Sequence, residues 1–359
     1  MREFRITVLP GDGIGREVMA SCLPLLDAVV SRVGGFRLVL TSYEAGAALY
    51  RDTGVTLPPE ALEAAGNADA ILLGAMGLPD VRYPNGTEVT TQIELRERFS
   101  LYAGVRPIRV LPGTPTPLAD PRARRIDYVL VRESTEGLFT ARQLTRRDGN
   151  AAVYDTMRIS RDTCERLFDF AFQVARKRAR GQRRGRVTCV DKANVLPAMA
   201  FFREIFLERA ARYPDVDADC AYVDATAMRL VRAPWDFDVL VTENMFGDIL
   251  SDLAAAVTGG IGLAPSASLS DGGPGIFEPV HGSAPDIAGR GVANPTAMLR
   301  STALLLRHGL ALPEQADALT RAIGVALASS PTADLGGTAT TAGFGDTLRA
   351  QLVADGAPR

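Results

Sequence analysis

Residues 237–253 read FDVLVTENMFGDILSDL, an apolar strand-like run that passes directly into a helix-compatible run. Asp248 and Asp252 stand four residues apart in the second run, which places them one turn apart on the same face of a helix. The apolar neighbours Ile249, Leu250 and Leu253 can bury the opposite face. Because two like charges at this spacing repel each other, a purely structural helix gains nothing from them. The stretch predicts one strand–helix step that carries an acidic pair.

A third carboxylate, Asp224, stands in CAYVDATAM (220–228), where a strand-like run gives way to a helical one. A hard divalent cation such as Mg²⁺ or Mn²⁺ is held by a few carboxylates together with substrate oxygens. The alternative is a solvated acidic face with an aspartate as helix N-cap. Asp224, Asp248 and Asp252 are therefore candidate metal ligands.

Strand-like and helix-like segments alternate on both sides of this stretch, which indicates α/β layering. The Gly/Pro-rich tract 259–279 is interpreted as a crossover that returns the chain to a first domain. We therefore predict one discontinuous domain at 1–101 plus 259–359 and a second at 102–258. The predicted strands are 4–9, 36–44, 70–76, 125–133, 185–192, 220–225 and 237–244, with helices at 15–33 and near 58–68.

Composition excludes several classes of protein. The 359 residues are 47% hydrophobic, which suffices for a large core, and 40 basic against 42 acidic residues leave a net charge of −2. No global field therefore favours nucleic acid or membrane binding. The basic run 176–186 is predicted to end a helix, where cations suit the helix dipole; a nucleic-acid patch around Arg183 and Arg184 is the weaker alternative, since no aromatics interleave it.

The first residues form a strand-like run rather than a signal peptide, and the chain has no apolar stretch long enough to span a bilayer, so we expect a cytoplasmic protein. The four cysteines show no CxxC spacing and are predicted to pack as small hydrophobes. They are Cys22, Cys164, Cys189 and Cys220.

The glycine cluster LPGDGIG (9–15) follows a strand and precedes a helix, as a dinucleotide-binding loop would. Its glycines are spaced GxGxG, however, and lack the three-residue step to the last glycine of the fingerprint. By itself the cluster indicates only a tight turn.

Cations in apolar surroundings suit an anionic substrate. Arg96, Arg106 and Arg132 stand in IELRERF, GVRPIR and YVLVRESTEG, and arginine offers a rigid fork of donors for carboxylates. Three of them beside a candidate metal site suggest a pocket for a di- or tricarboxylate. Lys192 ends another strand-like run; near a metal and other cations its amine would lose proton affinity, which makes it a candidate general base, although a lone lysine is usually a surface residue.

These motifs together resemble the β-decarboxylating dehydrogenases: the isopropylmalate, isocitrate, homoisocitrate, tartrate and D-malate dehydrogenases. The resemblance runs through nearly the whole chain, and NMFGDILSD (244–252) and HGSAPDIAGRGVANP (281–295) are its most specific parts. It implies a two-domain isopropylmalate/isocitrate dehydrogenase-like α/β fold without a standard Rossmann domain, and an obligate homodimer. It also implies oxidation of a 2-hydroxy diacid at C2 followed by loss of the β-carboxylate.

The resemblance also implies roles for individual residues. Arg96, Arg106 and Arg132 would hold the malate carboxylates, and Asp224, Asp248 and Asp252 would hold Mg²⁺ or Mn²⁺ as a Lewis acid. Lys192 would take the hydroxyl proton. Lys192 and Asp224 would come from the partner subunit and complete its site.

The implied cofactor is NAD. Asp286 stands where NAD-using members place an aspartate on the adenosine ribose, and a carboxylate there repels a 2′-phosphate. His281, Gly282, Ala293 and Asn294 would line the adenine side, with Ile14 and Glu88 nearer the nicotinamide. The full cofactor set is Ile14, Glu88, His281, Gly282, Ser283, Ala284, Asp286, Ile287, Ala293, Asn294 and Asp334.

Two departures concern the substrate. Phe139 replaces the tyrosine that reprotonates C3 in the family, and phenylalanine has no proton to give, so a non-catalytic NAD- or diacid-binding homologue is an alternative. The loop before Arg96 carries Thr91, Gln92 and Ile93 where isopropylmalate enzymes place leucines. The best single substrate is 3-isopropylmalate, which would place the chain in leucine biosynthesis; tartrate, D-malate or a specialised 3-substituted malate remain alternatives.

Overall fold

The computed structural model describes residues 2–33, 35–179 and 185–354. Contacts divide the chain into two compact units. Unit 1 comprises Met1–Phe99, Leu111–Pro115 and Gly259–Arg359, and unit 2 comprises Ser100–Val110 and Thr116–Thr258. The predicted division into domains at residues 101 and 258 stays a prediction.

Within unit 1 the strands follow the order β2-β1-β3-β12-β11. The pairs β1–β2, β1–β3 and β3–β12 are parallel, whereas β11 and β12 pair in antiparallel fashion. Every residue of β3 is buried, as expected for a parallel strand covered on both faces. The strands are β1 (Arg2–Gly11), β2 (Phe36–Ser42), β3 (Ala70–Ala75), β11 (Pro265–Leu269) and β12 (Gly275–Pro279).

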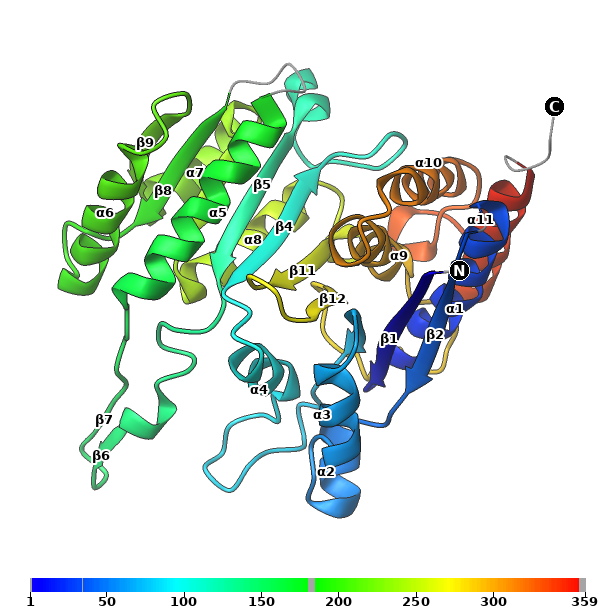
Figure 1. Cartoon of the computed structure of the whole chain (residues 1–359), viewed down its shortest axis with the longest axis horizontal. Coiled ribbons are helices and arrows are strands. Elements are labelled where there is room, and N and C mark those ends of the chain that lie inside the picture. Colours follow the sequence, from blue (N-terminus) through cyan, green and yellow to red (C-terminus); the bar gives the residue numbers. More distant parts are fainter. Residues whose placement is uncertain (1, 34, 180–184, 355–359) are drawn as a thin grey trace. The chain divides into compact units, whose positions relative to one another are not determined.

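The helices of unit 1 come from both ends of the chain. α1 packs against α11, and α9 packs against β11, β12 and α10, so the last third of the chain covers a sheet that the first third begins (Figure 1). The helices are α1 (Gly15–Val33), α2 (Ala47–Thr53), α3 (Pro59–Gly66), α4 (Thr91–Arg98), α9 (Thr296–Leu304), α10 (Pro313–Ser329) and α11 (Thr341–Ala354), with a π-helical turn at Leu305–Gly309.

Within unit 2 the strand order is β4-β5-β10-β8-β9. In this sheet β4–β5 is antiparallel, whereas β5–β10, β10–β8 and β8–β9 are parallel. The strands are β4 (Ala103–Arg109), β5 (Asp127–Glu133), β8 (Arg186–Asp191), β9 (Asp217–Tyr222) and β10 (Val239–Thr242), and the helices are α5 (Arg161–Ala179), α6 (Pro197–Ala210), α7 (Val223–Arg232) and α8 (Asn244–Val257).

The core of unit 2 forms because α5 is amphipathic. Its buried residues recur at three- and four-residue steps, so one stripe faces the sheet, and the rings of Phe168 and Phe202 lie 4.7 Å apart in an edge-on contact. A two-stranded hairpin of β6 (Arg146–Asp148) and β7 (Ala152–Tyr154) extends from the rest of this unit (Figure 1).

The structure bears out the α/β alternation and corrects two details. The strand predicted at 220–225 ends at Tyr222, so Asp224 lies in the first turn of α7 and is not its N-cap. The tract 259–279 is not only a connection, because it holds the hairpin of β11 and β12. The prediction that the basic run ends a helix is confirmed in its described part, because Arg176, Lys177 and Arg178 lie in the last turn of α5. Residues 180–184, including Arg183 and Arg184, lie outside the described residues. Among the helices that are described, none is long and apolar enough to cross a membrane.

Candidate active site

The acidic pair lies on α8, as its spacing predicts. Glu243 caps the helix by accepting hydrogen bonds from the backbone N–H groups of Met245 and Phe246 at 3.0 and 2.6 Å, which satisfies donors that a helix start otherwise leaves open. Leu250 is buried, Asp248 is half-buried and Asp252 is exposed. The expected burial of Ile249 is wrong, because its side chain is exposed on the same helix. The helix thus presents two carboxylates one turn apart.

Arg132 is the second-last residue of β5 and lies beside this helix. Its Nε and Nη2 atoms both donate to Asn244 Oδ1, at 3.0 and 2.8 Å, and its Nη1 donates to Asp248. The guanidinium is buried, so its plane is fixed by α8. Gly247 makes this approach possible, because a Cβ atom at that position would lie 2.6 Å from Arg132 Cγ.

Four charged groups of unit 2 influence one another: Asp248, Asp252, Arg106 and Arg132. Partial burial and the neighbouring Asp248 raise the pKa of Asp252, while Arg106 and Arg132 lower it. The two carboxylates repel each other, which suits a divalent cation between them. The two arginines suit the two carboxylates of a dicarboxylate. The oxygen donors fit Mg²⁺ or Mn²⁺.

Lys192 and Asp224 form a second group in unit 2. Lys192 follows β8, Asp224 follows β9, and Lys192 Nζ lies 2.9 Å from Asp224 Oδ1. This contact lowers the pKa of Asp224. In a single chain, as far as the structure describes it, Asp224, Asp248 and Asp252 do not gather within metal-sharing distance of one another. The structure therefore brings the predicted ligands together in two groups.

Arg96 belongs to unit 1, on α4, whereas Arg106 and Arg132 belong to unit 2. It forms an ion pair with Glu278 at 2.5 Å, and both side chains are buried. Glu278 was not among the predicted residues. Thr91, Gln92 and Ile93 begin α4 rather than forming the loop that we expected.

The LPGDGIG turn is structural, and it positions the predicted cofactor segment. Asp12 is buried and accepts hydrogen bonds from the backbone N–H groups of Ala47, Ala48 and Gly77, each at 2.8 Å. Gly13 has a φ of +54°, and a Cβ there would lie 2.0 Å from the Ser283 carbonyl. The Ile14 N–H donates to that same carbonyl at 2.7 Å, so the turn holds the chain next to His281.

His281 is the clearest candidate for contact with the adenine base of a cofactor. Its Nδ1 lies 3.0 Å from the Gly282 carbonyl, and because a carbonyl only accepts, Nδ1 must carry the hydrogen. Nε2 is buried and is left without a partner among the described residues. Burial lowers the pKa of His281, which favours the neutral form of the ring. Nε2 is then an acceptor that suits an amino group such as that of adenine.

The other predicted cofactor residues between 282 and 334 also belong to unit 1. Asn294 Nδ2 donates to Asp334 Oδ2 at 3.0 Å, and the Ala293 carbonyl accepts from Thr341 Oγ1 at 2.7 Å. Ala284 adopts a φ of +37°, a conformation that costs a residue with a side chain about 1 kcal/mol or more. Gly282 and Asp286 are exposed, Ala284 and Ile287 are half-buried, and Ser283 is buried.

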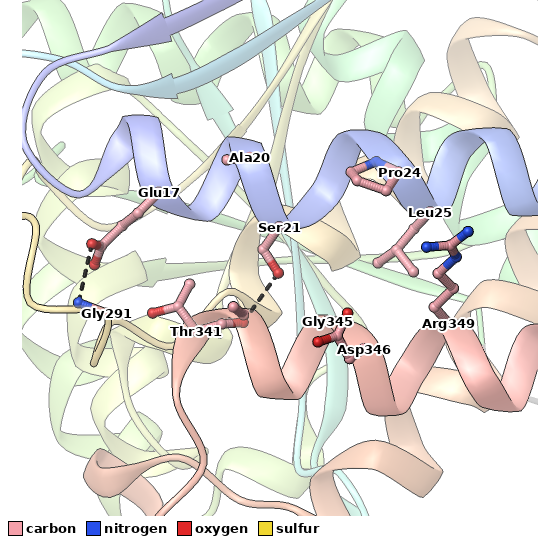
Figure 2. A pocket seen from close by; sticks show the side chains of 11 residues that line it. Glu17, Ala20, Ser21, Pro24, Leu25, Gly291, Thr341, Gly345, Asp346 and Arg349 are labelled. Carbon is pink, nitrogen blue, oxygen red and sulfur yellow. Dashed lines mark hydrogen bonds between the residues drawn. The ribbon is translucent and has the colours of Figure 1, made fainter.

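Glu17, on α1, holds the segment that follows Asp286. This role was not predicted from the sequence. Glu17 Oε2 accepts hydrogen bonds from the backbone N–H groups of Gly289 and Gly291, at 3.2 and 3.4 Å. Figure 2 shows Glu17 at one end of a pocket of about 320 Å³ between α1 and α11, with Arg349 at the other. A carboxylate that reaches two loop amides from a preceding helix leaves no short motif in the sequence.

Glu88 and Phe139 have less defined surroundings. Glu88 is exposed and pairs with Arg82 at 3.1 Å. Phe139 is half-buried, and the Arg132 guanidinium carbon lies 5.6 Å from its ring centroid. Phe139 therefore borders the arginine that is predicted to bind substrate.

Comparisons with known proteins identify the family of this chain. Residues 5–348 match the family model described as isocitrate/isopropylmalate dehydrogenase. The 3-isopropylmalate dehydrogenase of Anaeromyxobacter dehalogenans (strain 2CP-C) is 42% identical over 97% of this chain and 99% of its own. That of Zymomonas mobilis is also 42% identical, over 97% of this chain and its full length.

Solved structures show the same fold. The crystal structure of isocitrate dehydrogenase from Methylococcus capsulatus matches with a TM-score of 0.87 at 34% identity, covering 98% of this chain and 100% of its own. A β-decarboxylating dehydrogenase from Thermococcus kodakarensis in its apo form matches at 0.79 and 36% identity, covering 97% and 96%. The chain belongs to the isocitrate/isopropylmalate dehydrogenase family. It is a β-decarboxylating dehydrogenase with a mixed α/β fold.

Proposed function

We propose that this protein catalyses the NAD-dependent oxidative decarboxylation of a 3-substituted malate, with 3-isopropylmalate as substrate and Mg²⁺ or Mn²⁺ as metal. The observation that carries the proposal is the arrangement in unit 2, where Arg132 is fixed against Asp248 and both arginines act on Asp252. The high identity to 3-isopropylmalate dehydrogenases supports the choice of substrate.

The arginines would bind and orient the substrate. Arg106 and Arg132, whose side chains are buried, would each bind a malate carboxylate through two N–H donors. Arg96 would be the third arginine of the substrate site. A cation held by Asp224, Asp248 and Asp252 would supply Lewis acidity at the C2 oxygen. Lys192 would accept the hydroxyl proton, and its contact with Asp224 holds its amine at the edge of unit 2.

His281 and Asp286 support NAD as the hydride acceptor. The buried Nε2 of His281 offers an acceptor to the adenine amino group, and the exposed Asp286 offers two acceptors to a ribose diol. A carboxylate at that position repels a 2′-phosphate, which favours NAD over NADP.

We further propose that the enzyme is a homodimer in which Lys192 and Asp224 complete the partner's site. Within one chain, as far as it is described, Asp224 does not form a metal-ligand group with Asp248 and Asp252. Large apolar side chains are exposed on the adjoining helices α7 and α8, where Met228 is 54%, Val231 46% and Ile249 61% accessible. Exposed apolar side chains on neighbouring helices suit an interface between copies.

A substrate with a polar C3 group is the second candidate. Thr91 Oγ1 and Gln92 Oε1, on the first turn of α4, are buried and have no partner among the residues that the structure describes. Such atoms cost free energy unless a ligand or water meets them, so tartrate, with a hydroxyl at C3, would satisfy them better than an isopropyl group. D-malate has only hydrogen at C3 and would leave these two atoms without a partner.

Complementation tests the shared site and the chemistry together. Lys192→Ala and Asp248→Asn should each reduce metal-dependent NADH formation by about 10²-fold or more. When the two variants are co-expressed with different tags, half of the dimers are mixed, and each has one intact site, so about a quarter of the wild-type rate should return. Mixed dimers without activity would refute sharing between subunits. Full activity of both single variants would refute the proposed chemistry.

A further inference from the structure

Two free cysteines face each other beside the proposed catalytic lysine. Cys189 of β8 and Cys220 of β9 are partners in the register of the two parallel strands. With Asp191, their ligand atoms all lie within 4.8 Å of one another. Cys189 is buried and Cys220 is half-buried. The sequence spacing of 31 residues gives no sign of this pair.

Asp191 is already occupied, which argues against a metal at this cluster. Its two carboxylate oxygens accept from Arg203 Nε and Nη2 at 2.8 Å each, and one also accepts from the Ala193 N–H at 2.8 Å. A cation would have to displace Arg203 from a bidentate ion pair in which the Asp191 carboxylate is fully buried, and the loss of such a partner is costly. The chemistry left to the cluster is that of its two thiols.

We propose that Cys189 and Cys220 form a reversible disulfide, by exchange with a low-molecular-weight disulfide, and that this bond switches off the enzyme through Lys192 and Asp224. The existence of the thiol pair depends only on the strand register. Its effect on catalysis rests on the proposed function of those two residues.

The strand geometry permits the bond and makes it easy to reduce. Neighbouring strands lie about 4.8 Å apart, inside the Cα–Cα range of disulfides, about 4.4–6.8 Å, whereas the Cβ atoms must approach to about 3.8 Å. β9 is the last strand in the order of unit 2, and most of its residues are exposed, so it can shift toward β8. Strained disulfides are the more readily reduced ones.

The surroundings of the two sulfurs set the order of attack. A hydrogen bond from Cys189 and the charge of Arg203 lower the pKa of Cys220, whereas burial raises the pKa of Cys189. The Cys220 thiolate therefore attacks one sulfur of the small disulfide RSSR and releases RS⁻. Cys189 then loses its proton, attacks Cys220 Sγ and releases the second RS⁻. In balance, two protein thiols are oxidised and RSSR is reduced to two RSH.

The bond would act on the residues that directly follow it. β8 runs from Cys189 into Lys192, and β9 runs from Cys220 into Tyr222 and then Asp224. The Tyr222 ring centroid lies 5.9 Å from Lys192 Nζ and 4.9 Å from the Arg203 guanidinium carbon. A shift of β9 toward β8 would therefore move Tyr222 and Asp224 relative to Lys192 and change the geometry of the contact between Lys192 and Asp224, whose atoms lie 2.9 Å apart.

The test uses the full chain, first reduced and then incubated with glutathione disulfide. Peptide mass spectrometry should find Cys189 joined to Cys220 with the loss of two hydrogens. NADH formation should fall by at least about tenfold and return on addition of dithiothreitol. Cys220→Ser and Cys189→Ala should each keep their activity under oxidation, whereas the matched control Cys22→Ala, a buried cysteine elsewhere, should lose it like the wild type.

Two results would overturn the proposal: a glutathione adduct on Cys220 that never resolves to the internal bond, or an internal bond that leaves the rate unchanged. A reduced protein that turns over no malate but still forms the internal bond would contradict the proposed function and leave the thiol pair standing.

Discussion

The side chain of Arg132 occupies the space that a side chain at position 247 would fill. An added Cβ on Gly247 would lie 2.6 Å from Arg132 Cγ and 2.8 Å from its Cβ. The last residues of β5 and the first turn of α8 are thereby locked together, and the guanidinium reaches both Asn244 and Asp248. The glycine in NMFGD is a packing requirement of the arginine that we propose binds substrate.

Gly247→Ala should therefore displace Arg132. We expect KM for the diacid to rise by about tenfold or more and the free energy of unfolding to fall by about 1–3 kcal/mol, the usual cost of overpacking. Steady-state kinetics and urea unfolding measure both. Gly324→Ala is the matched control: it lies in α10 with nothing within 4 Å of an added Cβ, and it should stabilise by about 0.5–1 kcal/mol with unchanged KM. An unchanged KM in Gly247→Ala would contradict this account of Arg132.

Asp286→Ala should weaken NAD binding and relax discrimination against NADP. The lost hydrogen bonds to a charged acceptor are worth about 1.5–3 kcal/mol, or roughly 10- to 100-fold in KM for NAD. Removal of the negative charge also removes the repulsion of a 2′-phosphate. Kinetics with both cofactors measure the ratio. If the variant discriminates against NADP as strongly as the wild type does, Asp286 does not contact the ribose.

Glu133 should make stability depend on pH. Burial raises its pKa to about 7, against 4.5 for an exposed glutamate, although hydrogen bonds from Thr135 and Glu136 oppose the shift. The folded state then holds the proton more tightly, so the free energy of unfolding falls as pH rises from about 4.5 through about 7. Between about pH 5.5 and about pH 8 this one group should cost about 2 kcal/mol.

Glu133→Gln removes that titration while keeping the shape of the side chain. Urea unfolding of the wild type and the variant at both pH values gives the difference, because the other titrating groups are common to both. A pH dependence as steep in Glu133→Gln as in the wild type would show that Glu133 titrates alike in the folded and unfolded states.

Phe139→Tyr should restore a proton donor beside Arg132. If C3 protonation limits the rate, kcat should rise several-fold while KM stays within about twofold, since the ring keeps its place next to the guanidinium. Solvent isotope effects on kcat would show the change of limiting step. A kcat and an isotope effect that both stay at the wild-type values would mean that protonation at C3 is not slow in this chain.

The local part of the site could be predicted from sequence. The spacing of Asp248 and Asp252 placed them on one face of α8, and the switch from strand to helix placed Asp224 at the start of α7. Residues 15–33 form α1 with the predicted bounds. These features depend on periods of two and 3.6 residues, which are readable in one segment.

The supporting partners could not be predicted, because they are distant in sequence. Glu278 lies 182 residues from Arg96, and Glu17 lies 274 residues from Gly291. The β11–β12 hairpin was missed because glycines and prolines obscured its alternation. Only the fold brings Cys189 and Cys220 together.

NADH formation with Mg²⁺ across isopropyl-, hydroxy-, unsubstituted and carboxymethyl-substituted malates tests the proposed reaction. We expect turnover of 3-isopropylmalate with NAD, abolished by a chelator and restored by added Mg²⁺ or Mn²⁺. A preference for tartrate would favour the polar role of Thr91 and Gln92. If NAD binds but none of these malates is oxidised, the proposed reaction is contradicted.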